Sequence, residues 1–325
     1  MIAVRAVGIA AVVTLGIAAA SPATAQMYGV ATGKQGFFAY SAGAAISKVA
    51  SDNGLPLRVQ PFGGSSAYTP AVNANEVQFG IVNELETNYA VTGQVIYKGK
   101  PNPNVRVVTV INPLYSVLFV RKDSPIKTIA DLKGKRVPTD FVSQRVLDVL
   151  MQGALANAGL SYADVQKAPV PNVVGGADEF AQGKVDAFIF ALGGGKVAEV
   201  DAKVGGVRVL PADPSPEAIA QTRKFIPVGY TTTLQPAKGR VGIAEPTVVY
   251  AYDLLLLTND KVPEDAVYKL TKILHGNKKG LAAAFGPLAG FQPDRMARDL
   301  SPVQFHAGAI KFYKEIGAWP PKSGS

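Results

Sequence analysis

Short runs of apolar residues alternate with longer amphipathic stretches along most of the chain. Three of the runs, at residues 28–32, 57–60 and 77–82, have the length of buried strands. Helical patterns follow the first two runs at 40–53 and 68–74, after turns that carry glycine. Because strands that alternate with helices are typical of parallel βαβ units, we expect an α/β fold.

Two further apolar runs, at 115–120 and 247–256, look like crossings between two such units. The chain between them predicts a second α/β unit, with a long helix at 143–158. After the second crossing, the pattern is helical and should pack back on the first unit. We therefore expect two lobes joined by two adjacent strands, an arrangement that permits closure around a ligand.

The expected boundaries follow from these crossings. Lobe 1 comprises residues 26–118 and 250–325, and lobe 2 is inserted as residues 119–249. The stretch 211–242 is rich in Pro, Thr and Gly and predicts an irregular segment near the hinge.

The N-terminal segment predicts export. Arg5 precedes an apolar run at 6–17 that is too short to span a bilayer, and small residues at positions 23 and 25 precede a cleavage site. We interpret residues 1–25 as a secretory signal peptide and expect a periplasmic protein, with an uncleaved anchor as the alternative. No cysteine is available for a lipid anchor, a disulfide or a Cys-ligated zinc.

The composition indicates a basic protein but not one that binds nucleic acid. The 325 residues carry 33 Lys and Arg against 24 Asp and Glu, a net charge of +9. Nucleic-acid binding needs a dense basic stripe, whereas the longest basic clusters, at 133–136 and 278–279, are short and predict solvated faces. Anionic solutes remain suitable partners for a basic surface.

Candidate ligand contacts lie in loops that follow strands and open helices, where backbone N–H groups and the helix dipole favour an anion. Each loop also has a simpler interpretation, as a glycine turn or a helix cap. Arg145 could hold a carboxylate with two hydrogen bonds or lie solvated in a first helical turn. The candidates are Thr32, Gly33, Gln35, Gly36, Phe38, Tyr40, Gly64, Ser65, Ser66, Asn83, Glu84, Ser143, Arg145 and Gly193.

Enzyme signatures are missing from the sequence. The two histidines, His275 and His306, have no nucleophile motif nearby, and the glycine loop at 193–195 lacks the spacing of a nucleotide-binding P-loop. We expect a monomeric, non-catalytic binding protein without metal or cofactor.

An ordered set of motifs carries a family resemblance over almost the whole mature chain. The motifs are Thr32-Gly33-Lys34-Gln35-Gly36, Gln60-Pro61-Phe62-Gly63-Gly64-Ser65, Gly80-Ile81-Val82-Asn83-Glu84, Asp131-Leu132-Lys133-Gly134-Lys135-Arg136-Val137, Gly183-Lys184-Val185-Asp186-Ala187 and His306-Ala307-Gly308-Ala309. In these motifs the chain resembles the TAXI family of TRAP-associated solute receptors.

The resemblance implies a type II-like periplasmic-binding-protein fold, a small organic acid as ligand, and TRAP membrane permease subunits as partners. Departures at Phe38, Ala39 and 83–85 favour a more apolar acid than the glutamate-like ligands of that family. Three alternatives stay open: a sensor accessory that docks on a receptor kinase, a substrate receptor of an ATP-driven importer, and an enzyme that kept the fold.

Overall fold

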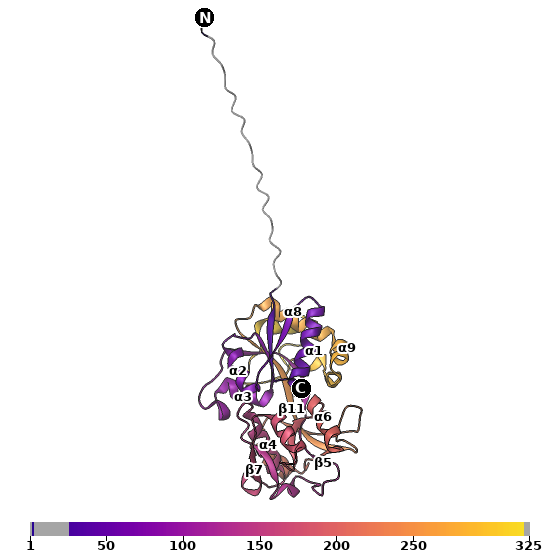
Figure 1. The fold of residues 1–325 in the computed structure, drawn as a ribbon. Coiled ribbons are helices and arrows are strands. Elements are labelled where there is room, and N and C mark those ends of the chain that lie inside the picture. Colours follow the sequence, from indigo (N-terminus) through magenta and orange to yellow (C-terminus); the bar gives the residue numbers. More distant parts are fainter. Residues whose placement is uncertain (1, 3–25, 322–325) are drawn as a thin grey trace.

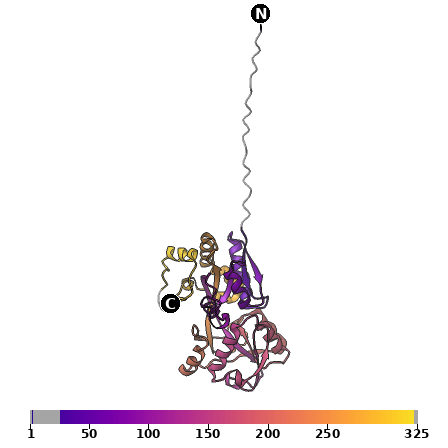
Figure 2. The ribbon, with the colours of Figure 1, turned by 90° about the vertical axis from the view of Figure 1, so that its left-hand side faces the viewer.

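The structure is a computed structural model that describes residue 2 and residues 26–321. The predicted signal peptide, residues 1–25, thus lies outside the described residues except for residue 2. Two lobes are stacked on each other (Figure 1), and the view from the side shows that the first and last parts of the chain share the upper lobe (Figure 2). No helix within residues 26–321 is long and apolar enough to cross a membrane.

A six-stranded sheet forms the centre of the upper lobe and reaches the lower lobe through the first residues of β11 (Thr247–Asn259), which pair with β10 (Tyr230–Leu234). Its order is β10-β11-β3-β1-β2, with β4 also paired to β11. β1 runs parallel to β2 and β3, whereas β11 runs antiparallel to β3, β4 and β10. The strands are β1 (Tyr28–Thr32), β2 (Leu57–Pro61), β3 (Phe79–Asn83), β4 (Val105–Leu114), β10 (Tyr230–Leu234) and β11 (Thr247–Asn259).

Helices pack on this sheet through apolar faces. The longest buries Phe38, Ala42, Ala45, Ile46 and Val49, a helical spacing that gives one apolar stripe. The helices of this lobe are α1 (Phe38–Asp52), α2 (Ser65–Asn73), α3 (Glu84–Thr92), α8 (Glu264–Gly276), α9 (Lys278–Ala284) and α10 (Ala307–Glu315), with short 3₁₀ turns at Val95–Tyr97, Gly286–Gly290 and Pro293–Arg295.

The lower lobe contains two small sheets. A three-stranded sheet has the order β8-β5-β9, and β6 pairs with β7. Its strands are β5 (Ser116–Arg121), β6 (Arg136–Thr139), β7 (Gln166–Pro169), β8 (Phe188–Ala191) and β9 (Val207–Val209). Its helices are α4 (Val146–Asn157), α5 (Val173–Ala181), α6 (Gly195–Val204) and α7 (Pro216–Arg223), with 3₁₀ turns at Ala130–Leu132 and Tyr162–Asp164.

The expectation of parallel units is wrong for part of both lobes. β5 pairs antiparallel with both β8 and β9, and only β6 and β7 form a parallel pair in the lower lobe. The cause lies in the crossings. The strands β5 and β11, which carry the chain between the lobes, run in the direction opposite to the strands they pair with. The segment 211–242 is also less irregular than expected, since it contains α7 and β10.

The crossing strands lie side by side. Only Tyr115 separates β4 from β5, and β11 pairs with β4 up to the register Tyr252↔Leu114. The hydroxyl groups of Ser116 and Tyr252 are hydrogen bonded at 2.5 Å, which ties the two connections together at the junction of the lobes.

A close helix contact in the upper lobe provides a test of the fold. His306 caps α10 by accepting a hydrogen bond from the Gly308 N–H, and a Cβ at Gly308 would lie 2.2 Å from the Glu264 carbonyl oxygen of α8. Gly308→Ala should therefore lower the free energy of unfolding by about 1–3 kcal/mol, as overpacking does. Chemical denaturation measures this loss.

The matched control is Gly276→Ala at the end of α8, because a Cβ there meets nothing within 4 Å. The control should be as stable as the parent or slightly more so, since alanine favours the helix. Equal stability of all three proteins would disprove the close packing of α8 and α10.

Candidate functional site

A cavity of about 60 Å³ lies between the two lobes. The upper lobe lines it with the starts of α1 and α2 and the end of β3, and the lower lobe lines it with the starts of α4 and α5 and the end of β8. Its wall comprises Gly33, Phe37, Phe38, Ala39, Ser65, Tyr68, Ile81, Asn83, Leu114, Ser116, Gln144, Leu147, Leu150, Val173, Phe190, Ala191, Tyr252 and Leu254.

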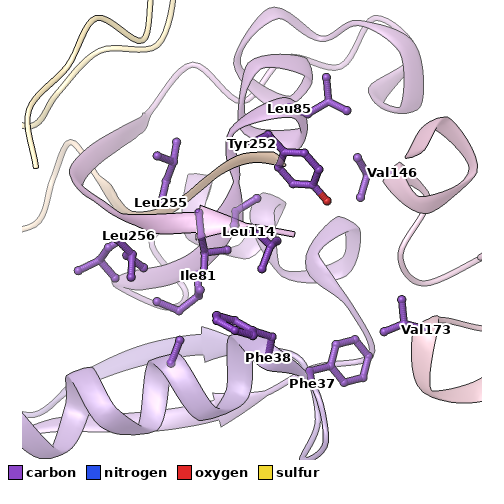
Figure 3. Close-up of a cluster of buried hydrophobic side chains, with 14 of the residues drawn as sticks. Phe37, Phe38, Ile81, Leu85, Leu114, Val146, Val173, Tyr252, Leu255 and Leu256 are labelled. Atoms are coloured by element: carbon purple, nitrogen blue, oxygen red, sulfur yellow. The ribbon is translucent and has the colours of Figure 1, made fainter. Parts of the chain in front are cut away.

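This wall is mostly apolar and contains no charged side chain. Figure 3 shows Phe37 and Tyr252 of the upper lobe pointing toward the side where Val173 and Val146 of the lower lobe lie. Ligand pockets are commonly built in this way, with apolar walls and a few placed polar groups. Selectivity at this site must then come from those few groups.

Helix N-termini supply the first set of polar groups. α1, α2 and α4 begin at the wall, and none of them has a side-chain cap. α5, which also begins there, is capped by Asn172. N–H groups in an uncapped first turn point outward with partial positive charge, so they can bind an anion.

Asn83 supplies a side-chain donor. Its Oδ1 caps α3 by accepting from the Glu86 N–H at 2.8 Å. The side chain is only 7% exposed and lines the cavity, and its Nδ2 has no hydrogen-bond partner within residues 26–321. This amide is therefore free to donate to a bound oxygen.

Gln144 offers the corresponding amide from the lower lobe. Its Oε1 accepts from the Val173 N–H at 3.4 Å, and its Nε2 has no partner in the described part of the chain. The two lobes thus each present one amide donor to the same space.

A buried carboxylate organises the seam between the lobes. Glu86 is fully buried and accepts hydrogen bonds from the hydroxyl groups of Ser65 and Ser66. Ser66 Oγ in turn accepts from the Arg145 N–H of the lower lobe at 3.0 Å. Burial raises the pKa of Glu86, and the hydrogen bonds from the two serines offset part of that rise.

Further contacts across the seam involve backbone atoms. Ser143 Oγ and Asn172 Nδ2 each donate to the Gly63 carbonyl oxygen at 3.2 Å. The Lys196 N–H donates to the Gly36 carbonyl oxygen at 3.4 Å. The lobes therefore touch on both sides of the cavity, which corresponds to a closed arrangement.

The structure brings only some of the candidate residues together. Four candidates line the cavity: Gly33, Phe38, Ser65 and Asn83. Five others lie along the seam where the two lobes touch: Gly36, Gly64, Ser66, Ser143 and Arg145. Gly193 lies next to them, since a Cβ on it would be 3.7 Å from the Phe38 ring.

The other candidates lie outside the cavity wall. Thr32 is buried and donates to the Gly33 carbonyl oxygen, Gln35 is exposed, and Tyr40 is half-buried. The guanidinium carbon of Arg145 lies 5.9 Å from the centre of the Tyr97 ring, and Arg145 is not a wall residue.

Glu84 belongs to a separate buried cluster. It pairs with Arg298, which also binds Asp253 at 2.7 Å. Burial raises the pKa of Glu84 to about 7, even though Arg298 favours the charged form. This carboxylate therefore holds the C-terminal segment to the base of α3 instead of facing the cavity.

Glu86 and Gln144 are the main site residues that sequence reasoning missed. Glu86 lies about twenty residues from its serine partners, so no local motif connects them. Gln144 was overlooked in favour of its neighbour Arg145, because arginine is the stronger carboxylate ligand. The 3.6-residue helical spacing places Leu147 and Leu150 beside Gln144 and could have indicated which face of α4 meets the cavity.

Comparisons with known proteins identify the relatives of this chain. The model of the NMT1-like family matches residues 30–317. A protein of Escherichia coli (strain K12), named for the binding of aliphatic sulfonates, is 32% identical over 123 residues. That match spans 36% of this chain and 34% of the relative.

Two solved structures share the fold. A periplasmic transporter superposes with a TM-score of 0.54 at 16% identity, over 90% of this chain and 92% of its own. The amino acid ABC transporter substrate-binding protein AbpA of Streptococcus pneumoniae, bound to L-arginine, gives 0.50 at 11% identity, over 82% and 96%. These matches confirm the two-lobed periplasmic-binding-protein fold.

The family match corrects one prediction. The resemblance to the TAXI family is wrong, because the matching model is that of the NMT1-like family, and TRAP permease subunits are not supported as partners. The prediction of a solute-binding protein agrees with the name of the E. coli relative.

Closure of the lobes can be tested at Gly64. Its backbone is extended, with φ of 171°, so any residue fits there conformationally. A Cβ would nevertheless lie 2.2 Å from the Ser143 carbonyl oxygen of the other lobe. Gly64→Ala should destabilise the closed arrangement by about 1–3 kcal/mol and enlarge the radius of gyration in small-angle scattering.

Gly195→Ala is the control, because it also adds a methyl group near the seam but meets no atom within 4 Å. Its scattering should equal that of the parent protein. Unchanged scattering for Gly64→Ala would show that the two lobes do not meet at this loop.

The raised pKa of Glu84 predicts a pH dependence of stability. Between the unfolded pKa of about 4.5 and the folded value of about 7, the folded state binds more protons, so this group makes stability fall as pH rises. Glu84→Gln removes that slope and leaves Arg298 paired with Asp253. Its stability relative to the parent should rise by about 1–3 kcal/mol from about pH 5 to about pH 8.

Urea denaturation at several pH values measures the difference. Glu315→Gln, at an exposed carboxylate on α10, is the control and should show no such rise. A constant difference between Glu84→Gln and the parent would refute the assignment to Glu84.

Proposed function

Because this chain belongs to the NMT1-like family, we propose that it is a periplasmic receptor that captures a small organic anion and delivers it to an ATP-driven importer. Residues 1–25 direct export in this proposal, and the mature protein acts as a monomer. Residues 26–118 and 250–325 form one lobe, residues 119–249 form the other, and the crossing strands are the hinge.

The observation that carries the proposal is a cavity with donors but no charged side chain. Uncapped starts of α1, α2 and α4 and the free amides of Asn83 and Gln144 all offer N–H groups. No carboxylate in the wall could pair with an ammonium or guanidinium group. This chemistry favours a sulfonate or carboxylate over a cationic ligand such as arginine.

The name of the E. coli relative agrees with this choice, since an aliphatic sulfonate has an anionic head and an apolar body. The apolar wall residues Phe37, Phe38, Leu147 and Phe190 suit such a body. Burial of that surface stabilises the closed state, and binding to the closed state draws the lobes together.

The test is a ligand screen by thermal unfolding and calorimetry. Linear alkanesulfonates and carboxylates should raise the melting temperature, as ligands of the native state do. Arginine and other cationic amino acids are the negative controls. The proposal fails if no sulfonate or carboxylate shifts melting, or if only cations do.

Asn83 gives a matched pair of variants. Asn83→Asp keeps the cap on α3 but replaces the Nδ2 donor with a negative charge, whereas Asn83→Ser keeps a capping oxygen without added charge. Asn83→Asp should weaken anion binding by about tenfold or more, and Asn83→Ser by less. Equal affinities of both variants and the parent, measured by calorimetry, would remove Asn83 from the site.

A further inference from the structure

Two hydroxyl groups in the wall of the cleft have their hydrogen atoms engaged on the side away from a ligand. Ser65 and Tyr68 lie three residues apart on α2, which places them on one face of that helix, and both line the cavity. The Ser65 hydroxyl donates to the buried Glu86 carboxylate, and the Tyr68 hydroxyl donates to the Ile81 carbonyl oxygen. Each hydroxyl therefore keeps only its lone pairs for a further partner.

Glu86 fixes the direction of the Ser65 hydroxyl. Its carboxylate also accepts hydrogen bonds from the hydroxyl groups of Ser66 at 2.6 Å and of Tyr97 at 3.4 Å. Three such bonds favour the ionised form, and an ionised carboxylate has no hydrogen to donate. Ser66 Oγ already accepts from the Arg145 N–H, whereas Ser65 Oγ accepts from no donor within residues 26–321.

The start of α2 therefore combines donors with an acceptor. Its first turn has no side-chain cap, so its N–H groups can bind an anionic head, and Ser65 is the first residue of that turn. In a closed cleft, an acceptor that loses water without gaining a donor costs free energy. A well-matched ligand must then carry a hydrogen-bond donor close to its anionic head.

A hydroxyl group suits this position better than an ammonium group does. The wall contains no charged side chain, so an ammonium group would lose its hydration without gaining a direct counter-ion. A hydroxyl group donates one hydrogen bond and brings no charge. On the carbon next to a carboxylate, it lies within reach of a residue that also adjoins the head.

We infer that the cleft selects a short 2-hydroxy acid, with Ser65 as the residue that determines this specificity and Glu86 as the residue that positions Ser65. The inference rests on the proposed function and adds the second functional group of its ligand. The carboxylate binds the N–H groups at the helix starts, and the ligand hydroxyl donates to Ser65 Oγ. The cavity of about 60 Å³ favours a short carbon chain.

The experiment compares lactate, propionate and alanine by calorimetry, taking the tighter enantiomer where there are two. These compounds share a three-carbon carboxylate skeleton and differ in a hydroxyl, a hydrogen or an ammonium group on the second carbon. The parent protein should bind lactate about five- to tenfold more tightly than propionate, the contribution of one well-placed hydrogen bond. Alanine should bind more weakly than lactate.

Ser65→Ala and Ser66→Ala form a matched pair of variants, because each removes one hydrogen bond from Glu86 and only Ser65 lines the cavity. Ser65→Ala should abolish the preference for lactate over propionate. Ser66→Ala loses the bond to the Arg145 N–H across the seam, so it should weaken both acids alike and keep the preference. A folding defect caused by the lost bond to Glu86 would affect both variants.

Three results would overturn the inference: equal affinities of the parent for lactate and propionate, tighter binding of alanine than of lactate, or an unchanged preference in Ser65→Ala. The inference also fails, while the proposed function stands, if neither lactate nor propionate binds but another carboxylate or a sulfonate does. Absence of binding by every carboxylate and sulfonate would overturn the proposed function itself, and the inference with it.

Discussion

The contact between the Gly63-Gly64 loop and the start of α4 decides whether the central cavity exists. Ser143 packs against this loop so tightly that only glycine fits at position 64, and the Ser66 hydroxyl joins the buried Glu86 to the Arg145 N–H of the other lobe. The wall of the cleft depends on this contact, because each lobe alone supplies only part of the wall. The crossing strands permit the two lobes to move toward each other, and the Gly63-Gly64 loop determines how closely they meet.

The composition of the cleft follows from the same constraint. A closed cavity excludes water, so a charged side chain in its wall would need a partner or a ligand of opposite sign. The chain places its nearby charges elsewhere, with Glu86 bonded to serines and Glu84 paired with Arg298. Helix N-termini and amide groups remain, and they can bind an anion without leaving a full charge buried in the empty protein.

The sequence was sufficient to predict the two-lobed α/β fold and several wall residues. Strands followed by glycine turns and helices have a local signal, and Gly33, Ser65 and Asn83 lie in such turns. Strand direction was not predictable in the same way, because β5 and β11 meet partners that are distant in the chain. Glu86 and Gln144 were missed for a similar reason: their roles depend on contacts across the fold, whereas the charge of Arg145 suggested a role that its position over Tyr97 does not support. The family was also misassigned, since short glycine-rich motifs recur among related binding proteins.

A crystal structure with a bromine-labelled propanesulfonate tests the central claim most directly, because sulfur and bromine locate the head and the tail separately. We expect the sulfonate between the lobes, within hydrogen-bond distance of backbone N–H groups at the starts of α1 and α2 and of Asn83 Nδ2. A sulfonate bound outside the cleft, or lobes that stay apart around an empty cleft in the presence of saturating ligand, would contradict the account.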